Sequence, residues 1–475
     1  MPAWRDITEL PHEELLALII SQQKQLQELH ALVERLKAEL EQARRSGKKQ
    51  AAPFSTNKPK SDPKKPGRKR GEGQFTNRQA PTEDEITEPL VLVPVTHEGC
   101  PCCGGNLEAA GVEMAYTTDL PKDIRATVTA YEVSVCRCTD CGKKVKGSHP
   151  DVAPDQHGAT AHRVSPRVMA VAHLLHFDTG VPVRKIPAVL KLLCGIVLTQ
   201  SAISQDCLRR SKAEVGDAYQ QLRASVKSAQ RVHTDDTGWR IGGVNAQLMG
   251  FETEQAAVFQ IRKQHRNEEV RELIPSDFPG VMITDRGRSY DAKEFDEVKQ
   301  QKCIGHIQRS IAAVVEKHAE QELPFCIELK RLLKEAVELW HSYHNSHSNI
   351  YRGAMFKFKA WQLKSAITDH LLNRDLSNPD CQRLLNGIGW HHDRGNLLRF
   401  LDDPRIEPTN NRAERALRPA VIARKVSQCS KNEEGAEAYA AFTSVVQTLR
   451  KNGVADLADE LTTIFSTGRV QCLSP

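Results

Sequence analysis

The first hydrophobic pattern along the chain is a heptad repeat. Two rows of mostly apolar residues alternate at spacings of four and three: Ile19, Leu26, Val33 and Leu40 in one row, and Leu15, Gln22, Leu29 and Leu36 in the other. These are the a and d positions of a coiled coil. The pattern predicts a coiled coil over residues 1–46. It favours a homodimer or higher oligomer over a helix packed on its own chain, because no nearby segment offers a matching apolar face.

Apolar periodicity disappears in residues 47–81, where Pro and Gly mix with a dense run of basic residues. Such a composition predicts a flexible basic linker. A concentration of one sign of charge favours contact with nucleic-acid phosphates over a linker that only aids solubility. The residues expected to contact double-stranded DNA here are Lys64, Lys65, Arg68, Lys69 and Arg70.

Helical periodicity returns in residues 151–227. Two short apolar-periodic helices flank a Gly turn there, with Thr199 or Ser201 as the cap of the second helix. The pair fits a DNA-binding helix-turn-helix and a plain helical hairpin equally well.

The period then changes from helix to strand. Residues 228–317 predict three successive strands (RVHTDDTGW, VNAQLMGFE and AAVFQIR), then a helix, the strand VMITD and the strand QKCIG. Three strands, helix, strand, helix, strand is the order of a ribonuclease-H-like fold. Residues 318–405 predict a helical insertion, and residues 406–475 a last, helix-rich part of the core. The expected fold class is therefore α+β multidomain, with the ribonuclease-H-like α/β core as the catalytic part.

Residues 82–150 contain two CxxC motifs. Cys100 and Cys103 form one CxxC knuckle and Cys138 and Cys141 form another, each followed directly by glycine. Paired knuckles of this kind present four thiolates to zinc, and glycine allows the tight turn that points backbone amides at the sulfurs. We expect a zinc-ribbon-like module with structural Zn²⁺ rather than unrelated buried cysteines.

The overall composition limits where the protein works. The 475 residues carry 13 cysteines, an odd number, and a net charge of +6. The opening residues lack the basic-then-apolar layout of a secretory signal, and no window is apolar enough for a membrane helix. We expect a cytoplasmic bacterial protein with reduced cysteines and no membrane partner, associated with the nucleoid when bound to DNA.

Carboxylates at the ends of predicted strands suggest metal-dependent chemistry. Two divalent ions held by carboxylates can activate a nucleophilic oxygen and stabilise a leaving oxygen at phosphorus. Asp235 follows RVHT and Asp285 follows VMIT, on strands that lie side by side in this fold. Glu414 would supply a third carboxylate from a helix that Asn410 is expected to cap.

The choice of these residues has alternatives. Asp236 competes with Asp235, but neighbouring strand residues point to opposite faces, so only one can be a ligand. The helix that carries Glu414 is expected to end or kink at Pro419. Arg418 lies one turn after Glu414 on the same face, where it could meet a DNA phosphate.

Several segments together resemble a known family. HTDDTGWRIGG is similar to HVDETGWR of transposases of the insertion-sequence-66 family, TDRGRSY resembles their SDGWSAY-like motif, and CIGHIQR resembles their CLAHLLR helix. FLDDPRIEPTNNRAERALRP, followed by RKVSQCSKNEEG, resembles their third block. The zinc knuckles, the basic GRKRG linker and the coiled coil appear in the same order as in that family.

The resemblance implies a DDE transposase. It assigns the catalytic, Mg²⁺- or Mn²⁺-binding carboxylates to Asp235, Asp285 and Glu414, and it implies helper proteins encoded by the same element. Two departures stand out: Asp236 occupies a position where the family has Glu, and Arg286 one where glycine usually follows the second Asp. Further DNA contacts are expected at His306, Arg309, Arg415, Arg418, Arg424 and Lys425.

Cys303 and His306 look like a Cys-x-x-His pair of the same family. We expect them to support the active site rather than bind metal, because two ligands alone seldom hold zinc. The alternative is a buried Cys and His at the start of a helix.

Three functions remain to be compared. The first is a transposase that binds the ends of its element, cleaves them by two-metal-ion hydrolysis and joins the 3′-OH strands to target DNA. The second is a catalytically inactive, transposase-derived, zinc-containing DNA-binding protein. The third is a ribonuclease-H-like nuclease or resolvase, which needs no strand transfer.

Overall fold

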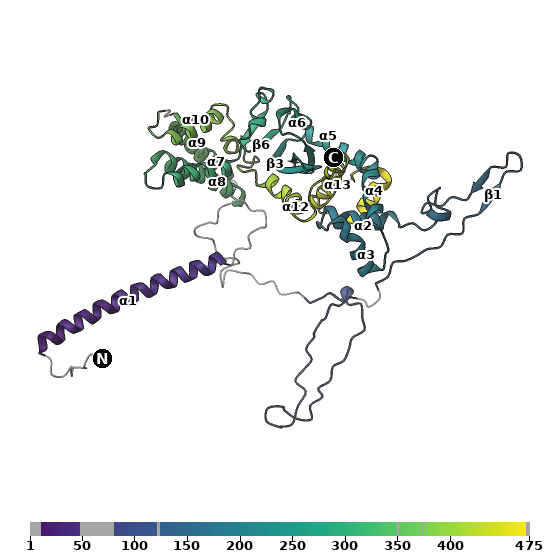
Figure 1. Ribbon diagram of the computed structural model, residues 1–475, viewed down its shortest axis with the longest axis horizontal. Coiled ribbons are helices and arrows are strands. Elements are labelled where there is room, and N and C mark those ends of the chain that lie inside the picture. The colour runs from purple at the N-terminus through teal and green to yellow at the C-terminus, as the bar shows by residue number, and fades with distance from the viewer. Residues whose placement is uncertain (1–10, 48–79, 121–123, 349–350, 373–374, 472–475) are drawn as a thin grey trace. The chain divides into compact units, whose positions relative to one another are not determined.

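The protein is described from a computed structural model, which covers residues 11–47, 80–120, 124–348, 351–372 and 375–471 (Figure 1). The chain divides into two compact units, Met1–Leu120 and Pro121–Pro475. The basic residues expected at 64–70 lie outside the described residues. Within the described part of the chain, no helix combines the length and the apolar character that a membrane crossing needs.

The first unit begins with the long helix α1 (His12–Gly47). Four of its predicted seam residues, Leu26, Leu29, Val33 and Leu36, are between 39% and 59% exposed. Apolar side chains in a regular row are left in water along this helix, which is what a helix awaiting a partner helix would present. The helix itself agrees with the sequence, and its pairing into a coiled coil stays a prediction.

The rest of the first unit is mostly extended. Apart from the 3₁₀ turn η2 (Glu83–Glu85), its described residues after 80 form neither helix nor strand. Apolar side chains in this stretch are largely exposed, among them Val91 at 77% and Val93 at 88%. This segment therefore has no hydrophobic core of its own.

The second unit opens with the short hairpin β1 (Val135–Arg137) and β2 (Lys144–Lys146), followed by helices α2 (Pro166–Phe177), α3 (Ile186–Cys194), α4 (Gln200–Ser211) and α5 (Glu214–Lys227). Gly195 adopts a left-handed conformation, with φ of 68°, and ends α3. Thr199 caps α4 by accepting a hydrogen bond from the backbone of Ala202. The helix pair around a Gly turn is confirmed, and its role as a helix-turn-helix stays a prediction.

A five-stranded mixed sheet forms the centre of the second unit. Its strands are β3 (Arg231–Ile241), β4 (Val244–Glu252), β5 (Ala257–Arg262), β6 (Val281–Thr284) and β7 (Lys299–Lys302), in the order β5-β4-β3-β6-β7. The first three strands pair antiparallel, whereas β6 and β7 run parallel to β3. The short helix α6 (Asn267–Arg271) connects β5 to β6. The first four predicted strands are thus present, in a mixed α+β fold. The last strand, β7, begins two residues earlier than the predicted QKCIG, and Ile304 and Gly305 begin α7 (Ile304–Lys317).

Two local predictions about the core are wrong. The helix expected between β6 and β7 is replaced by two 3₁₀ turns, η5 (Arg288–Tyr290) and η6 (Lys293–Phe295). The large apolar residues in this connection are Tyr290, Phe295 and Val298, which are all buried. Their spacing of five and three is too sparse for a helical stripe, so the chain instead turns each of them into the core.

The other error concerns the position of Asp235. The sequence placed it at a strand end, but β3 continues through it to Ile241, because β4 pairs with β3 from His233 to Ile241. Only the pairing with β6 stops before Asp235, at His233 and Ile283. Asp235 therefore lies where β3 and β6 part, rather than where β3 ends.

The helical insertion packs beside β6 and β7. It comprises α7 (Ile304–Lys317), α8 (Pro324–Asn345), the π-helical turn η7 (Tyr351–Met355), α9 (Phe356–Leu372), α10 (Pro379–Asp393) and α11 (Arg399–Asp402). The described residues of this part contain no strand, as expected. Figure 1 shows α7 to α10 gathered on the β6 side of the sheet.

Three helices complete the chain: α12 (Asn411–Ser427), α13 (Glu433–Lys451) and α14 (Leu457–Thr467). Pro419 lies inside α12, so the helix does not end there, and a kink at this residue stays a prediction. Proline inside a helix removes the backbone hydrogen bond to the carbonyl four residues earlier, at Arg415, and its ring crowds that carbonyl. Arg415 is exposed, so water can satisfy that carbonyl.

Side chains on the two faces of β6 pack into two different hydrophobic cores. Met282 packs into the core formed with α5, α13 and α14, whereas Ile283 packs into the core of the insertion. Successive strand residues point to opposite faces, so both cores hold the same short strand. Asp285, the residue directly after β6, is therefore fixed from both sides.

Candidate active site

Asp285 begins a tight turn after β6. Its Oδ1 accepts a hydrogen bond of 2.8 Å from the backbone N–H of Gly287. A Cβ on residue 287 would lie 2.9 Å from that same oxygen, closer than side chains tolerate. Glycine at 287 therefore lets the turn close over the carboxylate and fixes its direction.

Asp235 lies in a negatively charged surrounding. Burial and, after it, the charges of Asp285, Asp236 and Glu414 together raise the pKa of its carboxyl to about 7, against a lowering hydrogen bond from the backbone of Asp236. Like charges disfavour the ionised form when no cation offsets them. The three predicted carboxylates are thus close enough to interact electrostatically.

Glu414 lies in the first turn of α12, where the helix dipole favours a carboxylate. Its Oε1 accepts a hydrogen bond of 3.2 Å from Nη2 of Arg309 on α7. The Nδ1 atom of His306 lies 3.9 Å from the same oxygen. The carboxylate of Glu414 is therefore paired with the guanidinium of Arg309.

Asn410 attaches α12 to the sheet, a role that the sequence did not reveal. It precedes α12 as expected, but its side chain does not cap the helix. Instead its Nδ2 donates a 2.7 Å hydrogen bond to the carbonyl of Thr234, the residue before Asp235. Its backbone N–H donates to Sγ of the buried Cys303, at 3.2 Å. One buried residue thus links the elements that carry Asp235, Glu414 and His306.

Cys303 and His306 lie at the start of α7, and their supporting role stays a prediction. Cys303 is 1% exposed and precedes α7. Burial raises the pKa of its thiol, although hydrogen bonds from Asn410, His306 and Gly305 act in the opposite direction. A buried thiol with a raised pKa is a poor metal ligand and a poor nucleophile.

Asp236 has a partner of its own. Its Oδ1 lies 3.0 Å from Nδ1 of His265, and Nε2 of His265 lies 3.3 Å from Oγ of Ser289. His265 was not identified from the sequence, because a single His before a short helix has no distinguishing pattern. Asp236 is thus paired with His265, whereas the charged groups that shift the pKa of Asp235 are carboxylates.

A buried ion pair adjoins Thr284, the residue before Asp285, and sequence reasoning missed it too. Lys302, at the end of β7, is completely buried, and its Nζ lies 2.8 Å from Oδ1 of Asp291 and 3.2 Å from Oγ1 of Thr284. Burial lowers the pKa of Lys302, and Asp291 opposes that change. Lysine in a strand usually faces water, so nothing in the sequence distinguished this one.

The donor atoms at this edge suit a hard cation. Carboxylate oxygens are the ligands that Mg²⁺ and Mn²⁺ prefer. The raised pKa of Asp235 reflects burial and, after it, neighbouring negative charge that such an ion would neutralise. No group of three or more His, Cys, Asp or Glu side chains among the described residues is gathered closely enough to hold a metal. Glu414 faces Arg309, and completing a three-carboxylate set requires it to leave that arginine.

The cysteine knuckles are formed locally. The backbone N–H of Gly104 donates to the carbonyl of Cys100, and that of Gly142 to the carbonyl of Cys138. Both glycines have positive φ, 75° and 71°. Hydrogen bonds from the backbone of Cys102 and Cys103 lower the pKa of Cys100, and those from Cys141 and Asp140 lower that of Cys138. Each knuckle therefore favours thiolate, the form that binds zinc. The two knuckles belong to different units of the structure.

The remaining residues expected to contact DNA divide into two groups. Arg415, Arg418 and Lys425 are exposed on α12. Arg424 instead donates hydrogen bonds to Oγ1 of Thr237 and to the carbonyl of Gly238, so it fastens α12 to β3. Arg309 is 59% exposed and paired with Glu414.

This chain matches one protein-family model and is similar to several known proteins. A model described as "Transposase IS66 family" matches residues 162–438, more than half of the chain. The uncharacterized protein y4hP of Sinorhizobium fredii is 24% identical over 418 residues, 81% of this chain and 73% of its own length. The uncharacterized protein y4jD of the same organism is 24% identical over 422 residues, 82% of this chain and 78% of its own length. The matched region contains Asp235, Asp285 and Glu414.

Proposed function

Because the chain belongs to the IS66 (insertion-sequence-66) family of transposases, we propose that it is a DDE transposase whose metal-binding carboxylates are Asp235, Asp285 and Glu414. In this proposal it binds the ends of its element, hydrolyses the phosphodiester bond there and transfers the freed 3′-OH to target DNA. The observation that carries the proposal is the position of Asp235 and Asp285 just past the last paired residues of the neighbouring parallel strands β3 and β6.

The core would be of the ribonuclease-H-like type. Support comes from the strand order β5-β4-β3-β6-β7, with three antiparallel strands followed by two that run parallel to β3. Ligands and catalytic groups gather where neighbouring parallel strands separate at their carboxyl ends. Asp235 and Asp285 follow the last paired residues of β3 and β6 at that place.

Mg²⁺ or Mn²⁺ bound by these carboxylates would polarise the phosphate and lower the pKa of the attacking water or hydroxyl. The chain's own residues prepare this site. Asn410 holds Glu414 against β3, and Gly287 orients Asp285. Lys302 neutralises Asp291, so that this further acidic group does not compete for the cation. His265 occupies Asp236 in the same way, which favours Asp235 as the ligand.

Other parts of the chain would bring the DNA and a second copy to this site. The proposed zinc module uses Cys100, Cys103, Cys138 and Cys141, whose knuckles favour thiolate. The exposed apolar row of α1 would pair two chains. The exposed cations of α12 would contact the backbone of double-stranded DNA, and helper proteins of the same element would complete the machinery.

The competing function is a DNA-binding protein without catalytic activity. A cleavage assay separates the two, with DNA that carries the element's ends and with Mg²⁺ or Mn²⁺ in the buffer. We expect wild type to nick the ends, Asp285→Asn to lose this activity, and the exposed Asp277→Asn control to keep it. Equal inertness of wild type and Asp285→Asn, with DNA binding intact in both, would establish the binder.

A further inference from the structure

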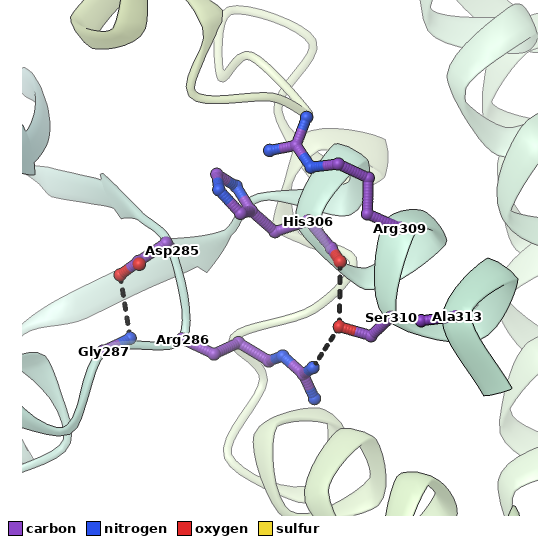
Figure 2. Close-up of a pocket in the computed structure, with 7 residues that line it drawn as sticks. All are labelled: Asp285, Arg286, Gly287, His306, Arg309, Ser310 and Ala313. Atoms are coloured by element: carbon purple, nitrogen blue, oxygen red, sulfur yellow. Dashed lines mark hydrogen bonds between the residues drawn. The ribbon is translucent and has the colours of Figure 1, made fainter. Parts of the chain in front are cut away.

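A pocket adjoins Asp285 on the side of the helical insertion (Figure 2). Its volume is about 390 Å³ and it is open to solvent. It lies between the turn after β6 and one face of α7, and it is lined by Asp285, Arg286, Gly287, His306, Arg309, Ser310 and Ala313. Apart from Asp285, its charged walls are basic.

Arg286 is an unusual wall residue, because it is a partly buried cation with little to bind. Its Nη2 donates a 2.8 Å hydrogen bond to Oγ of Ser310, as Figure 2 shows. Among the described residues, no carboxylate forms an ion pair with it. Burial lowers its pKa, with Asp285 and Asp291 opposing the change. A guanidinium has five N–H donors, and removing it from water is costly unless those donors meet an acceptor.

His306 supplies a second, independent sign of a missing partner. Its Nδ1 is buried and has no hydrogen-bond partner in the described part of the chain. It comes from the first turn of α7 and lines the same pocket as Arg286. Two polar groups from different elements therefore border one opening: in the described part of the chain Nδ1 of His306 has no partner, and Arg286 has a single hydrogen bond, to Ser310. Buried polar groups in proteins are normally paired.

Arg309 adds a third group whose partner can change. It is 59% exposed, lines the pocket and pairs with Oε1 of Glu414. If Glu414 binds a cation, as the proposed function requires, this guanidinium loses its carboxylate. It then has donors free for an anion in the pocket that it already lines.

We infer that this pocket binds one phosphate of the DNA backbone, with Arg286 as its fixed anchor and Arg309 as a second donor released from Glu414. The inference rests on the proposed function for the identity of the anion. Guanidinium groups match phosphate geometry by donating two parallel hydrogen bonds. Arg286 stands where the resembled family usually has glycine, so this anchor is a feature of this chain. It would hold the DNA strand next to Asp285, where the reacting phosphorus is needed.

The test measures DNA binding and requires no cleavage. The full chain is titrated with a short fluorescein-labelled duplex at several salt concentrations, in EDTA and in Ca²⁺, and anisotropy gives the affinity and its salt slope. Arg286→Ala should weaken binding about tenfold and lower the logarithmic salt slope by about one, the value for one lost phosphate contact. Arg286→Lys should keep the slope and lose part of the affinity, because charge remains without the two-pronged geometry.

Exposed Arg288, two residues away and outside the pocket lining, is the matched control: Arg288→Ala should change neither quantity. A photoreactive p-benzoylphenylalanine in place of Ala313 should crosslink to the duplex, and less so when combined with Arg286→Ala. Equal losses in Arg286→Ala and Arg288→Ala, an unchanged slope in Arg286→Ala, or no crosslink from position 313 would each overturn the inference. An inert cleavage assay with intact effects of Arg286→Ala would reject only the catalytic proposal.

Discussion

Sequence motifs predict two sites in this chain: the carboxylate edge of the sheet, with Asp235, Asp285 and Glu414, and the cysteine segment, residues 98–145. The two regions are organised differently. Around Asp285, β6 is held by two hydrophobic cores, through Met282 and Ile283. Around Cys100, the knuckle closes through its own backbone hydrogen bonds, while apolar neighbours such as Val93 remain exposed. One region takes its geometry from packing and the other has only local turns.

This difference shows what packing can and cannot supply. Burying apolar side chains fixes strands and helices closely enough to bring acidic residues together against their mutual repulsion. A segment without such a core needs another source of free energy, and in small cysteine modules metal binding is that source. We therefore expect metal removal to unfold the cysteine segment and to leave the sheet folded.

The largest effect is expected from removing a carboxylate at the sheet edge. Glu414→Gln keeps the shape of the side chain and removes its charge, so cleavage of element ends should fall by about 10³-fold or more. The melting temperature should change little, because α12 stays attached through Asn410. Glu437→Gln, at an exposed position on α13, is the control and should cleave as wild type does. Normal cleavage by Glu414→Gln would remove this residue from the site.

The next effect concerns the cysteine segment alone. Stripping zinc with a chelator, or Cys138→Ser, should raise hydrogen-exchange rates between residues 98 and 145 by about tenfold or more, since metal binding and folding are coupled. Exchange in β3 and β6 should stay as it was. Metal analysis of the purified chain gives the zinc content in parallel. Equal loss of protection in the sheet would show that the two regions are not independent.

Asn410→Ala tests the attachment of α12 to the sheet. Truncation leaves the carbonyl of Thr234 without its buried donor, which should cost about 1–3 kcal/mol of unfolding free energy. Cleavage should fall more than the stability loss explains, because Glu414 is no longer held against β3. Chemical denaturation and cleavage at a temperature where the variant is fully folded separate the two effects. Activity equal to wild type at that temperature would contradict the positioning role.

The smallest effect is a pH dependence in which two groups of the sheet edge oppose each other. Burial lowers the pKa of His233 to about 3, so its contribution to stability is lost as pH falls from about 6.5 towards 3. Burial and like charges raise the pKa of Asp235 to about 7, so its penalty is relieved as pH falls from about 7 towards 4. These contributions partly cancel in wild type.

Single substitutions should separate them. Asp235→Asn should make unfolding free energy fall more steeply on acidification, and His233→Gln should make it fall less steeply, each by up to about 1.4 kcal/mol per pH unit. Denaturation curves between pH 5 and 8 give both slopes. Parallel curves for wild type and both variants would mean that neither group has a shifted pKa.

Much of the sheet could be predicted because its strands show the two-residue hydrophobic period of β-structure. The three antiparallel strands and VMIT appeared where expected, and Asp285 followed its strand. The reach of β3 past Asp235 was not predictable, because it depends on pairing with β4 rather than on local composition. The same holds for Lys302, His265 and the side chain of Asn410. Their roles come from partners distant along the chain, and a single sequence contains no sign of such contacts.

The most direct test of the account is a crystal structure of the full chain with DNA ends and Mn²⁺, with the ion located by its anomalous scattering. We predict an ion bound by Asp235, Asp285 and Glu414, with Arg309 moved off Glu414 and Asp236 still paired with His265. An ion bound through Asp236 instead, or a Glu414 that stays on Arg309 while the ends are cleaved, would contradict it.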